Sequence, residues 1–364
     1  MGKLSRYILR ETLLGVFSAA AVIIAVIILI DYVETSRDIA TRADISALQA
    51  LTLTLYKAPL LIQETTPFII LFGVLFTFFR LSRRSELIVM RASGYSAWRI
   101  LAPATALCLV LGIASATLLN PLGASANARF EQTRDQMLDG QTGEARGAEG
   151  EVWLREPRPD GFVVITAERL EPEAAKLISP VFRIYRLSGE APTLEQRISA
   201  TEAQLSGGFW SLSEASERQV GAEPVALGDF ALPTSIARQA LFERARSPGA
   251  TSFWDLPGVI DSAQAAGLSS RPYELRWHSL LAQPILLFAA ALIAVAATFR
   301  LHRMGGAAGF AAAGAIAGFG LYFTQELLLG LGSSAALEPR TAAWTAPILF
   351  ALAGLFFIAL TEDG

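Results

Sequence analysis

Apolar residues dominate both ends of the chain, and a long polar stretch separates them. Six apolar runs approach the roughly 20 residues that an α-helix needs to cross the hydrocarbon core of a bilayer. Between the third and fourth runs, over about residues 122–275, apolar runs shrink to a few residues. The pattern predicts three membrane spans, one soluble domain and three further spans. The six runs lie at about 12–33, 58–79, 100–120, 279–299, 307–331 and 342–360.

The first apolar run favours a retained span over a cleaved signal peptide. Its apolar core from Leu13 to Ile30 is longer than the roughly 7–15 residues of a signal peptide. The run ends in Asp31 and Glu34, with no small-residue cleavage pattern. We therefore count it as the first of the six spans.

Basic residues are distributed unevenly between the two sides of these spans, which predicts their orientation. Loops rich in Lys and Arg tend to stay in the cytoplasm. Both termini are therefore predicted to be cytoplasmic and the polar insert to be periplasmic. The basic residues on the predicted inner side are Lys3, Arg6, Arg10, Arg80, Arg83, Arg84, Arg91, Arg99, Arg300 and Arg303. The short loops on the other side carry only Arg37, Arg42, Lys57 and Arg340.

The polar insert has the pattern of an antiparallel β-domain. Short, partly alternating runs such as "GFVVITAERL", "VFRIYRL" and "GFWSLSEA" are separated by turn signals. Several such strands in succession predict a sandwich or jelly roll. Residues 252–267 predict a connecting helix with Ser252 as its N-cap. The expected domains are thus 1–121 and 276–364 in the membrane, with 122–275 as a periplasmic β-jelly-roll domain.

The composition agrees with a membrane protein and offers no catalytic or metal-binding set. Of the 364 residues, 52% are hydrophobic and 17% charged, against about 25% charged in soluble domains. The net charge of −3 gives no reason to expect nucleic-acid binding. Cys108 is the single cysteine, and His278 and His302 lack metal-ligand spacing. We expect a non-enzymatic protein without a metal or cofactor.

The loop "RRSELIVMRASGYS", residues 83–96, predicts a short helix within 82–96 that Gly94 ends. Two interpretations of this helix remain open: docking on a partner protein, or lying on anionic lipid. The chain has no P-loop, so any ATP-driven process would need a separate ATPase subunit. On a helical projection, Arg83, Arg84, Leu87 and Arg91 share one side, Ile88, Val89 and Ala92 share another, and Glu86 lies between them.

Ionisable and other polar residues within or beside spans are candidate functional groups, because a membrane makes them costly. They either lie in the wet interface or line a polar path or gate at the outer leaflet. The candidates are Asp31, Glu34, Arg37, Glu64, Gln325 and Glu326. The fifth span also holds Gly305-xxx-Gly309 and Gly314-xxx-Gly318, a spacing that lets helices approach closely within or between chains.

The chain resembles the LptF/LptG permeases of the lipopolysaccharide exporter, an ABC transporter. The similarity rests on "RYILRETL", the "RRSELIVMRASG" loop, "FWDLP", "LLAQPILLFAAALIA" and "LTEDG", together with the plan of three spans, β-domain and three spans. The C-terminal half, with "GFGLYFTQE" and "AAWTAPILFALAG", is more similar to the LptG branch of the family than to LptF.

The resemblance implies a set of partners and a transport route. An LptF-like and an LptG-like permease would form a heterodimer above two copies of an LptB-like ATPase. Lipopolysaccharide would leave the outer leaflet of the inner membrane and pass through periplasmic jelly rolls toward the outer membrane, by way of an LptC-like single-span protein and an LptA-like bridge. Glu86 matches the coupling-helix glutamate that contacts the ATPase, and spans 1 and 5 would form lateral gates.

One departure from the family pattern concerns the substrate. Some LptG proteins carry a basic residue near the outer end of span 1, suited to lipid A phosphates. Here that region reads "ILIDYVETSRD", without lysine. Two alternatives follow: Arg37 and Arg42 take that role, or the substrate carries fewer phosphates.

Two other classes of function stay open on the sequence. One is a mechanotransmitting ABC-type subunit that carries no lipid itself, which would need no acyl-binding groove in the insert. The other is a proton-coupled carrier using Glu64 and Glu326, for which the sequence shows no inverted repeat.

Overall fold

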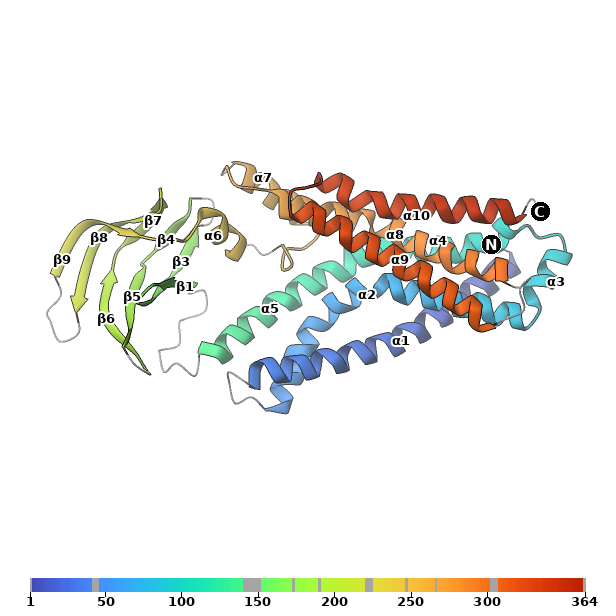
Figure 1. Cartoon of the computed structure of the whole chain (residues 1–364), viewed down its shortest axis with the longest axis horizontal. Coiled ribbons are helices and arrows are strands. Elements are labelled where there is room, and N and C mark those ends of the chain that lie inside the picture. Colours follow the sequence, from blue (N-terminus) through green and yellow to red (C-terminus); the bar gives the residue numbers. More distant parts are fainter. Residues whose placement is uncertain are drawn as a thin grey trace. The chain divides into compact units, whose positions relative to one another are not determined.

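A computed structural model of the chain describes residues 2–40, 46–139, 152–171, 174–188, 191–219, 225–245, 248–265, 267–301 and 307–362 (Figure 1). The chain forms two compact units. A helical unit comprises Met1–Gln141, Gly249–Pro257 and Arg271–Gly364, and a β unit comprises Thr142–Pro248 and Gly258–Ser270.

Long helices make up the helical unit. Within the described residues, six of them are long and apolar enough to cross a membrane, so the prediction of six spans is confirmed. The helices of the unit are α1 (Lys3–Ala40), α2 (Ala47–Arg83), α3 (Glu86–Ala92), α4 (Ala97–Ala114), the π-helix η1 (Ser115–Leu119), α5 (Asn120–Asp139), α8 (Arg271–Leu301), α9 (Ala307–Ser333) and α10 (Pro339–Glu362).

Small residues and local caps explain how these helices begin and pack. A capping box starts α2: the Ser46 hydroxyl accepts from the Gln49 backbone N–H, and the Gln49 side chain accepts from the Ser46 N–H. A Cβ atom on Gly73 would lie 2.6 Å from the Cα of Val16, so only glycine lets α2 approach α1 this closely. Gly112 of α4 has the same role against Pro284 of α8.

The third span does not end where the hydrophobic pattern does. The sequence predicts a boundary near residue 121, but the helix passes through η1 and continues as α5 to Asp139. A π-helical turn widens the helix and releases backbone carbonyls from their normal partners. The Ser115 carbonyl accepts from the Asn120 N–H within this turn and also from the Gln63 amide of α2 at 3.4 Å.

The β unit is a curled antiparallel half-barrel, which confirms the predicted all-β insert. Its described strands form one nine-stranded sheet in the order β1-β2-β5-β6-β8-β7-β4-β3, with β9 paired to β8. The strands are β1 (Val152–Arg158), β2 (Gly161–Ala167), β3 (Arg169–Glu171), β4 (Lys176–Ile178), β5 (Val181–Ser188), β6 (Ala191–Ser199), β7 (Glu202–Ser206), β8 (Phe209–Gln219) and β9 (Val225–Pro233).

The long strand β8 produces the curl. Its residues 209–213 pair with β7, its residues 216–219 pair with β6, and β9 follows it along the other edge. The register shifts around Ala215, which marks an irregularity where the strand changes neighbour. The sheet therefore bends around a core in which Phe182 and Trp210 meet edge to face at 6.1 Å.

Two short helices accompany the β unit. The sequence pattern did not predict α6 (Arg238–Ala245), whose Leu241 packs into the same core. The predicted connecting helix at 252–267 is present as α7 (Leu256–Ala265). Residues 252–255 instead form a turn, closed by the Leu256 N–H donating to the Ser252 carbonyl at 3.1 Å.

A buried carboxylate fastens the first strand to the chain that follows the last strand. Glu156 of β1 is 4% exposed. It accepts from the Thr234 hydroxyl at 2.8 Å, the Ser235 N–H at 2.6 Å and the Ser235 hydroxyl at 2.9 Å. Nearby, Arg158 donates to the Pro233 carbonyl at 3.2 Å. These contacts substitute for a strand pairing at this point.

We expect Glu156→Gln to lower the free energy of unfolding of the β unit by about 1.5–3 kcal/mol, because hydrogen bonds to a charged acceptor are lost in a buried site. Hydrogen exchange of the full chain would show this as faster exchange in β1 and at residues 234–236. Glu202→Gln is the matched control, because Glu202 forms only a surface ion pair with Lys176, expected to contribute about 0–1 kcal/mol. Equal effects of the two variants would contradict the role of Glu156.

Candidate functional site

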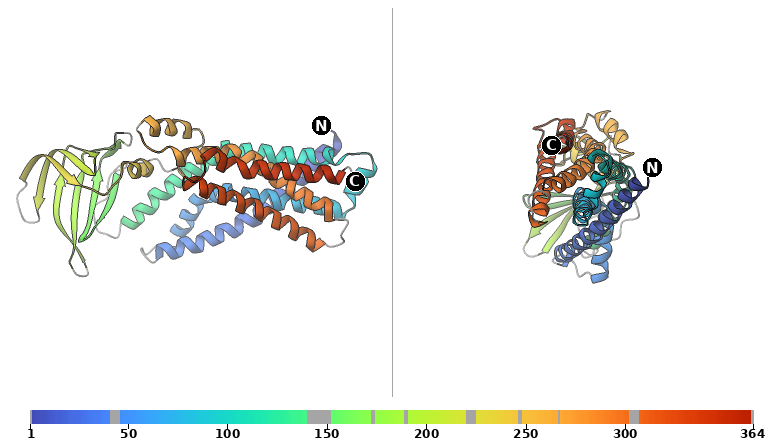
Figure 2. Two further views of the ribbon diagram at one scale, coloured as in Figure 1. Left: turned by 45° about the horizontal axis from the view of Figure 1, so that its top comes forward. Right: turned by 90° about the vertical axis from the view of Figure 1, so that its right-hand side faces the viewer.

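The loop after α2 forms a short helix at one end of the bundle. Ser85 adopts a left-handed conformation with φ of 60°, which separates α2 from α3, and Gly94 with φ of 85° follows its end. The helix thus spans Glu86–Ala92 within the predicted range 82–96. Figures 1 and 2 show α3 at the end of the bundle where α1 begins and α10 ends.

One residue anchors α3 and its two neighbours are exposed. Leu87 is 6% exposed and belongs to the core of the bundle, whereas Ile88 is 49% and Val89 62% exposed. The helical projection grouped Leu87 with the arginines, but the structure turns it away from the surface. The exposed face of α3 therefore offers an apolar pair, near which Arg83, Arg84 and Arg91 are also exposed.

Glu86 connects α3 to the first helix. The Tyr7 hydroxyl of α1 donates to Glu86 Oε2 at 2.6 Å, and Arg84 Nη1 lies 3.9 Å from Glu86 Oε1. Farther along α1, Glu11 forms an ion pair with Arg80 of α2. Tyr7 and Glu11 could not be recognised from the sequence pattern, because their partners are distant in the sequence. A displacement of α3 would therefore act directly on α1.

At the other end of α1, the candidate acid Asp31 is already paired. It is 6% exposed and forms an ion pair with Lys57 of α2, and it also accepts from Thr35 at 3.3 Å. Asp31 therefore holds α1 against α2. The candidates Glu34 and Arg37 are exposed on α1, and Arg42 lies outside the described residues.

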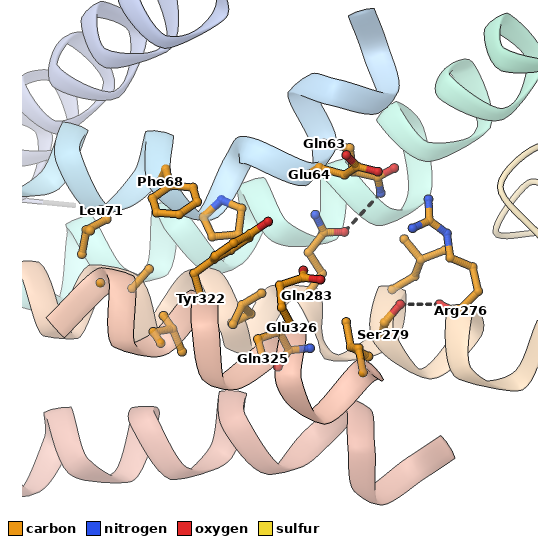
Figure 3. Close-up of a pocket in the computed structure, with 17 residues that line it drawn as sticks. Gln63, Glu64, Phe68, Leu71, Arg276, Ser279, Gln283, Tyr322, Gln325 and Glu326 are labelled. Atoms are coloured by element: carbon orange, nitrogen blue, oxygen red, sulfur yellow. Dashed lines mark hydrogen bonds between the residues drawn. The ribbon is translucent and has the colours of Figure 1, made fainter. Parts of the chain in front are cut away.

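The other acidic candidates meet at a cavity of about 110 Å³ between α2, α8 and α9 (Figure 3). Glu64 of α2 lies on its wall together with Gln325 and Glu326 of α9. Arg276 of α8, which the sequence analysis overlooked, lines the same cavity. The signal for it was an arginine in the first turns of an apolar run, directly before "WHSLLAQPILL".

A hydrogen-bonded cluster fixes one wall of this cavity. The Gln63 amide donates to Gln283 Oε1 at 3.3 Å, and Gln283 donates to the Ser115 hydroxyl at 3.0 Å (Figure 3 shows the first bond). Asn120 donates to Gln63 Oε1 at 3.1 Å and accepts from the Phe253 N–H at 2.7 Å. The cluster therefore joins α2, α5 and α8, and the π-helical turn contributes Ser115 to it.

The glycines of the fifth span face α2. A Cβ atom on Gly314 would lie 3.0 Å from Leu75, and one on Gly318 would collide with the side chain of Leu71. Both glycines therefore allow close packing within the chain. Gly305 lies outside the described residues.

The helical unit combines three features: six helices that are long and apolar enough to cross a membrane, a cavity among them with charged residues at one end, and the exposed helix α3 at the end of the bundle. The model of one family, described as lipopolysaccharide export system permease LptF/LptG, matches residues 6–360. No curated protein matched the chain. The chain belongs to the LptF/LptG family, and is thus a permease subunit of the inner-membrane lipopolysaccharide export ABC transporter rather than a catalytic subunit.

We expect Leu87→Ala to loosen α3 by about 2–5 kcal/mol, the usual cost of truncating a buried leucine. Hydrogen exchange across residues 84–96 would then become faster. Val89→Ala is the control, since an exposed side chain contributes within about 0.5 kcal/mol. If both variants left exchange unchanged, Leu87 would not anchor the helix.

Proposed function

We propose that the chain is the LptG-like half of a heterodimer with an LptF-like permease, and that it extracts lipopolysaccharide from the outer leaflet of the inner membrane. The match to the family over residues 6–360 is the observation that carries this proposal. The assignment to LptG rather than LptF rests on the resemblance of the C-terminal half, including "GFGLYFTQE".

The proposed orientation places α3 and both termini in the cytoplasm and the β unit in the periplasm. In support of this orientation, the start of α1, the end of α10 and the helix α3 all lie at the same end of the bundle (Figures 1 and 2). The basic residues Lys3, Arg6 and Arg10 lie near the start of α1, and further arginines surround α3. An excess of basic residues marks the cytoplasmic side.

Two copies of a separate LptB-like ATPase are proposed to drive transport, one of them docked on α3. The exposed Ile88 and Val89 offer an apolar contact, and the flanking arginines and Glu86 offer charged ones. The chain has no P-loop of its own, so ATP would act only through this partner. Movement of α3 would reach α1 through the hydrogen bond between Glu86 and Tyr7.

The β unit is proposed to pass lipopolysaccharide to an LptC-like single-span protein and an LptA-like bridge. Among the described strands, β1 and β3 end the strand order of its curled sheet. An edge strand presents unpaired backbone groups that another chain can extend. This property suits a route built from successive β-domains that dock edge to edge.

We expect Glu86→Arg to uncouple the transporter. The change removes the acceptor of the Tyr7 hydrogen bond and reverses the charge beside the docking surface, and like-charge contacts at an interface cost several kcal/mol. In proteoliposomes containing the whole complex, ATP-driven release of lipopolysaccharide should fall roughly tenfold or more.

The matched control is Glu338→Arg, which reverses an exposed charge just before α10, away from α3. This variant should keep full activity. Full assembly together with full transport-coupled ATP hydrolysis in the Glu86→Arg complex would refute the coupling role.

A further inference from the structure

Four arginines form a single row across the sheet of the β unit. Arg183 of β5 pairs with Arg197 of β6, and Arg197 pairs with Arg218 of β8. These three strands lie side by side (Figure 1). On the other side of β5, Val164 of β2 lies between Arg183 and Arg155 of β1. Since neighbouring strands are about 4.8 Å apart, this arginine row extends about 19 Å across the strands.

The arginine row lies on the face of the sheet opposite the core. Side chains alternate between the two faces along a strand. Phe182 and Ile198, which are sequence neighbours of the row, are fully buried in the core. Three of the four arginines are exposed, and Arg183 is half-buried. The guanidinium groups of the row are therefore available to a partner.

This arrangement is unfavourable for the sheet alone. Like charges directly opposite each other on neighbouring strands destabilise a sheet. Neither Arg197 nor Arg218 forms an ion pair with a described residue, whereas Arg186, at the end of β5, is paired with Glu195 at 2.8 Å. The chain as a whole has a net charge of −3. The row is thus a local excess of positive charge, which an anionic partner would neutralise.

Two arginines of the row are held in place before any partner binds. The Cζ atom of Arg155 lies 4.0 Å from the centre of the Phe162 ring, and this ring stacks on Tyr185 at 5.0 Å. Arg183 donates to the Thr166 hydroxyl at 3.2 Å. An ordered side chain loses less conformational entropy on binding. The planar guanidinium also fits a carboxylate with two parallel hydrogen bonds.

The shape of this surface narrows the class of partner. The arginines follow one line across the strands, which fits a linear anion rather than a flat membrane surface. Arg155 and Tyr185 cover the two faces of the Phe162 ring, so a sugar ring cannot stack on it. Alternate residues of an extended acidic segment lie about 6.7 Å apart, a spacing that long arginine side chains can follow.

We propose that the arginine row is a docking site for an extended acidic segment of a partner protein. Carboxylates of that segment accept hydrogen bonds from the guanidinium groups along the row. The inference goes beyond the proposed function, because it concerns the outer face of the sheet rather than its edge strands or the ATPase contact at α3. It also holds for either half of the heterodimer.

The test measures binding of a fluorescent peptide of alternating glutamate and serine by fluorescence anisotropy. The full chain, with its native partner subunits, is placed in nanodiscs of phosphatidylcholine, which carry no net charge. We expect Arg197→Gln/Arg218→Gln to weaken binding of the peptide about tenfold or more, because charge-assisted hydrogen bonds are lost. Binding to the unaltered chain should weaken as salt is added.

The matched control is Arg186→Gln, which removes an arginine that already has a partner in Glu195. This variant should bind the peptide within about twofold of the unaltered chain, because a surface ion pair contributes little to the fold. The melting temperature provides a second control. The Arg197→Gln/Arg218→Gln chain should melt no earlier than the unaltered chain, since the change relieves repulsion between like charges.

Three outcomes would overturn the proposal. The first is equal binding of the peptide to the unaltered chain and to Arg197→Gln/Arg218→Gln. The second is equal binding of a peptide in which glutamine replaces glutamate, which would exclude recognition by charge. The third is tighter binding of purified lipopolysaccharide or of phosphatidylglycerol vesicles than of the peptide, with the same dependence on positions 197 and 218. That result would assign the row to a lipid headgroup instead of a protein.

Discussion

The fold of the helical unit depends on one constraint: a bilayer supplies no water, so polar groups inside the spans must find partners in the protein. Ion pairs between Asp31 and Lys57 and between Glu11 and Arg80 hold α1 against α2 near both ends. The rest of α1 keeps a large apolar face exposed, including Phe17 and Val22. Helix α1 thus has an ion pair to α2 near each end and an apolar surface between them. This arrangement suits a helix that contacts lipid or a second permease.

The same constraint distinguishes polar groups that are paired within the chain from those that are not. The cluster of Gln63, Asn120 and Gln283 is closed by its own hydrogen bonds, and it joins α2, α5 and α8 beside the π-helical turn. Arg276 and Gln325 face the neighbouring cavity without such closure.

A second line of contacts leads from the surface to the spans. Leu87 anchors α3 in the core, Ile88 and Val89 remain exposed beside it, and Glu86 reaches Tyr7 of α1. A partner that pushes α3 would thus act on α1 through this hydrogen bond.

Much of this organisation could be predicted from hydrophobic periodicity alone. The spans and most strands follow from the lengths of apolar runs and from turn signals, because these depend on neighbours in the sequence. The hydrophobic pattern does not predict features that depend on residues distant in the sequence. The ion pair between the candidate gate residue Asp31 and Lys57 joins two helices, so a local pattern does not reveal it. Leu87 was grouped with the exposed arginines because a projection of one helix cannot show the bundle beneath it.

Three further features could not be predicted from the sequence. Strand β9 is mostly exposed and lacks alternation, so nothing in its sequence distinguishes it from a loop. The extension into α5 is polar and depends on the π-helical turn, which no periodicity predicts. Arg276 is a single charge at the start of an apolar run, and its importance appears only when α2 and α9 place Glu64 and Gln325 around the same cavity.

The central claim is that this permease works as one half of an assembly driven by a separate ATPase. Affinity purification of the chain from its native membrane, followed by mass spectrometry of co-purifying proteins and lipids, tests it most directly. A P-loop ATPase, a related six-span permease and bound lipopolysaccharide should be recovered together, and Glu86→Arg should lose the ATPase while keeping the second permease. Recovery of the chain alone, with only bulk phospholipid, would contradict the claim.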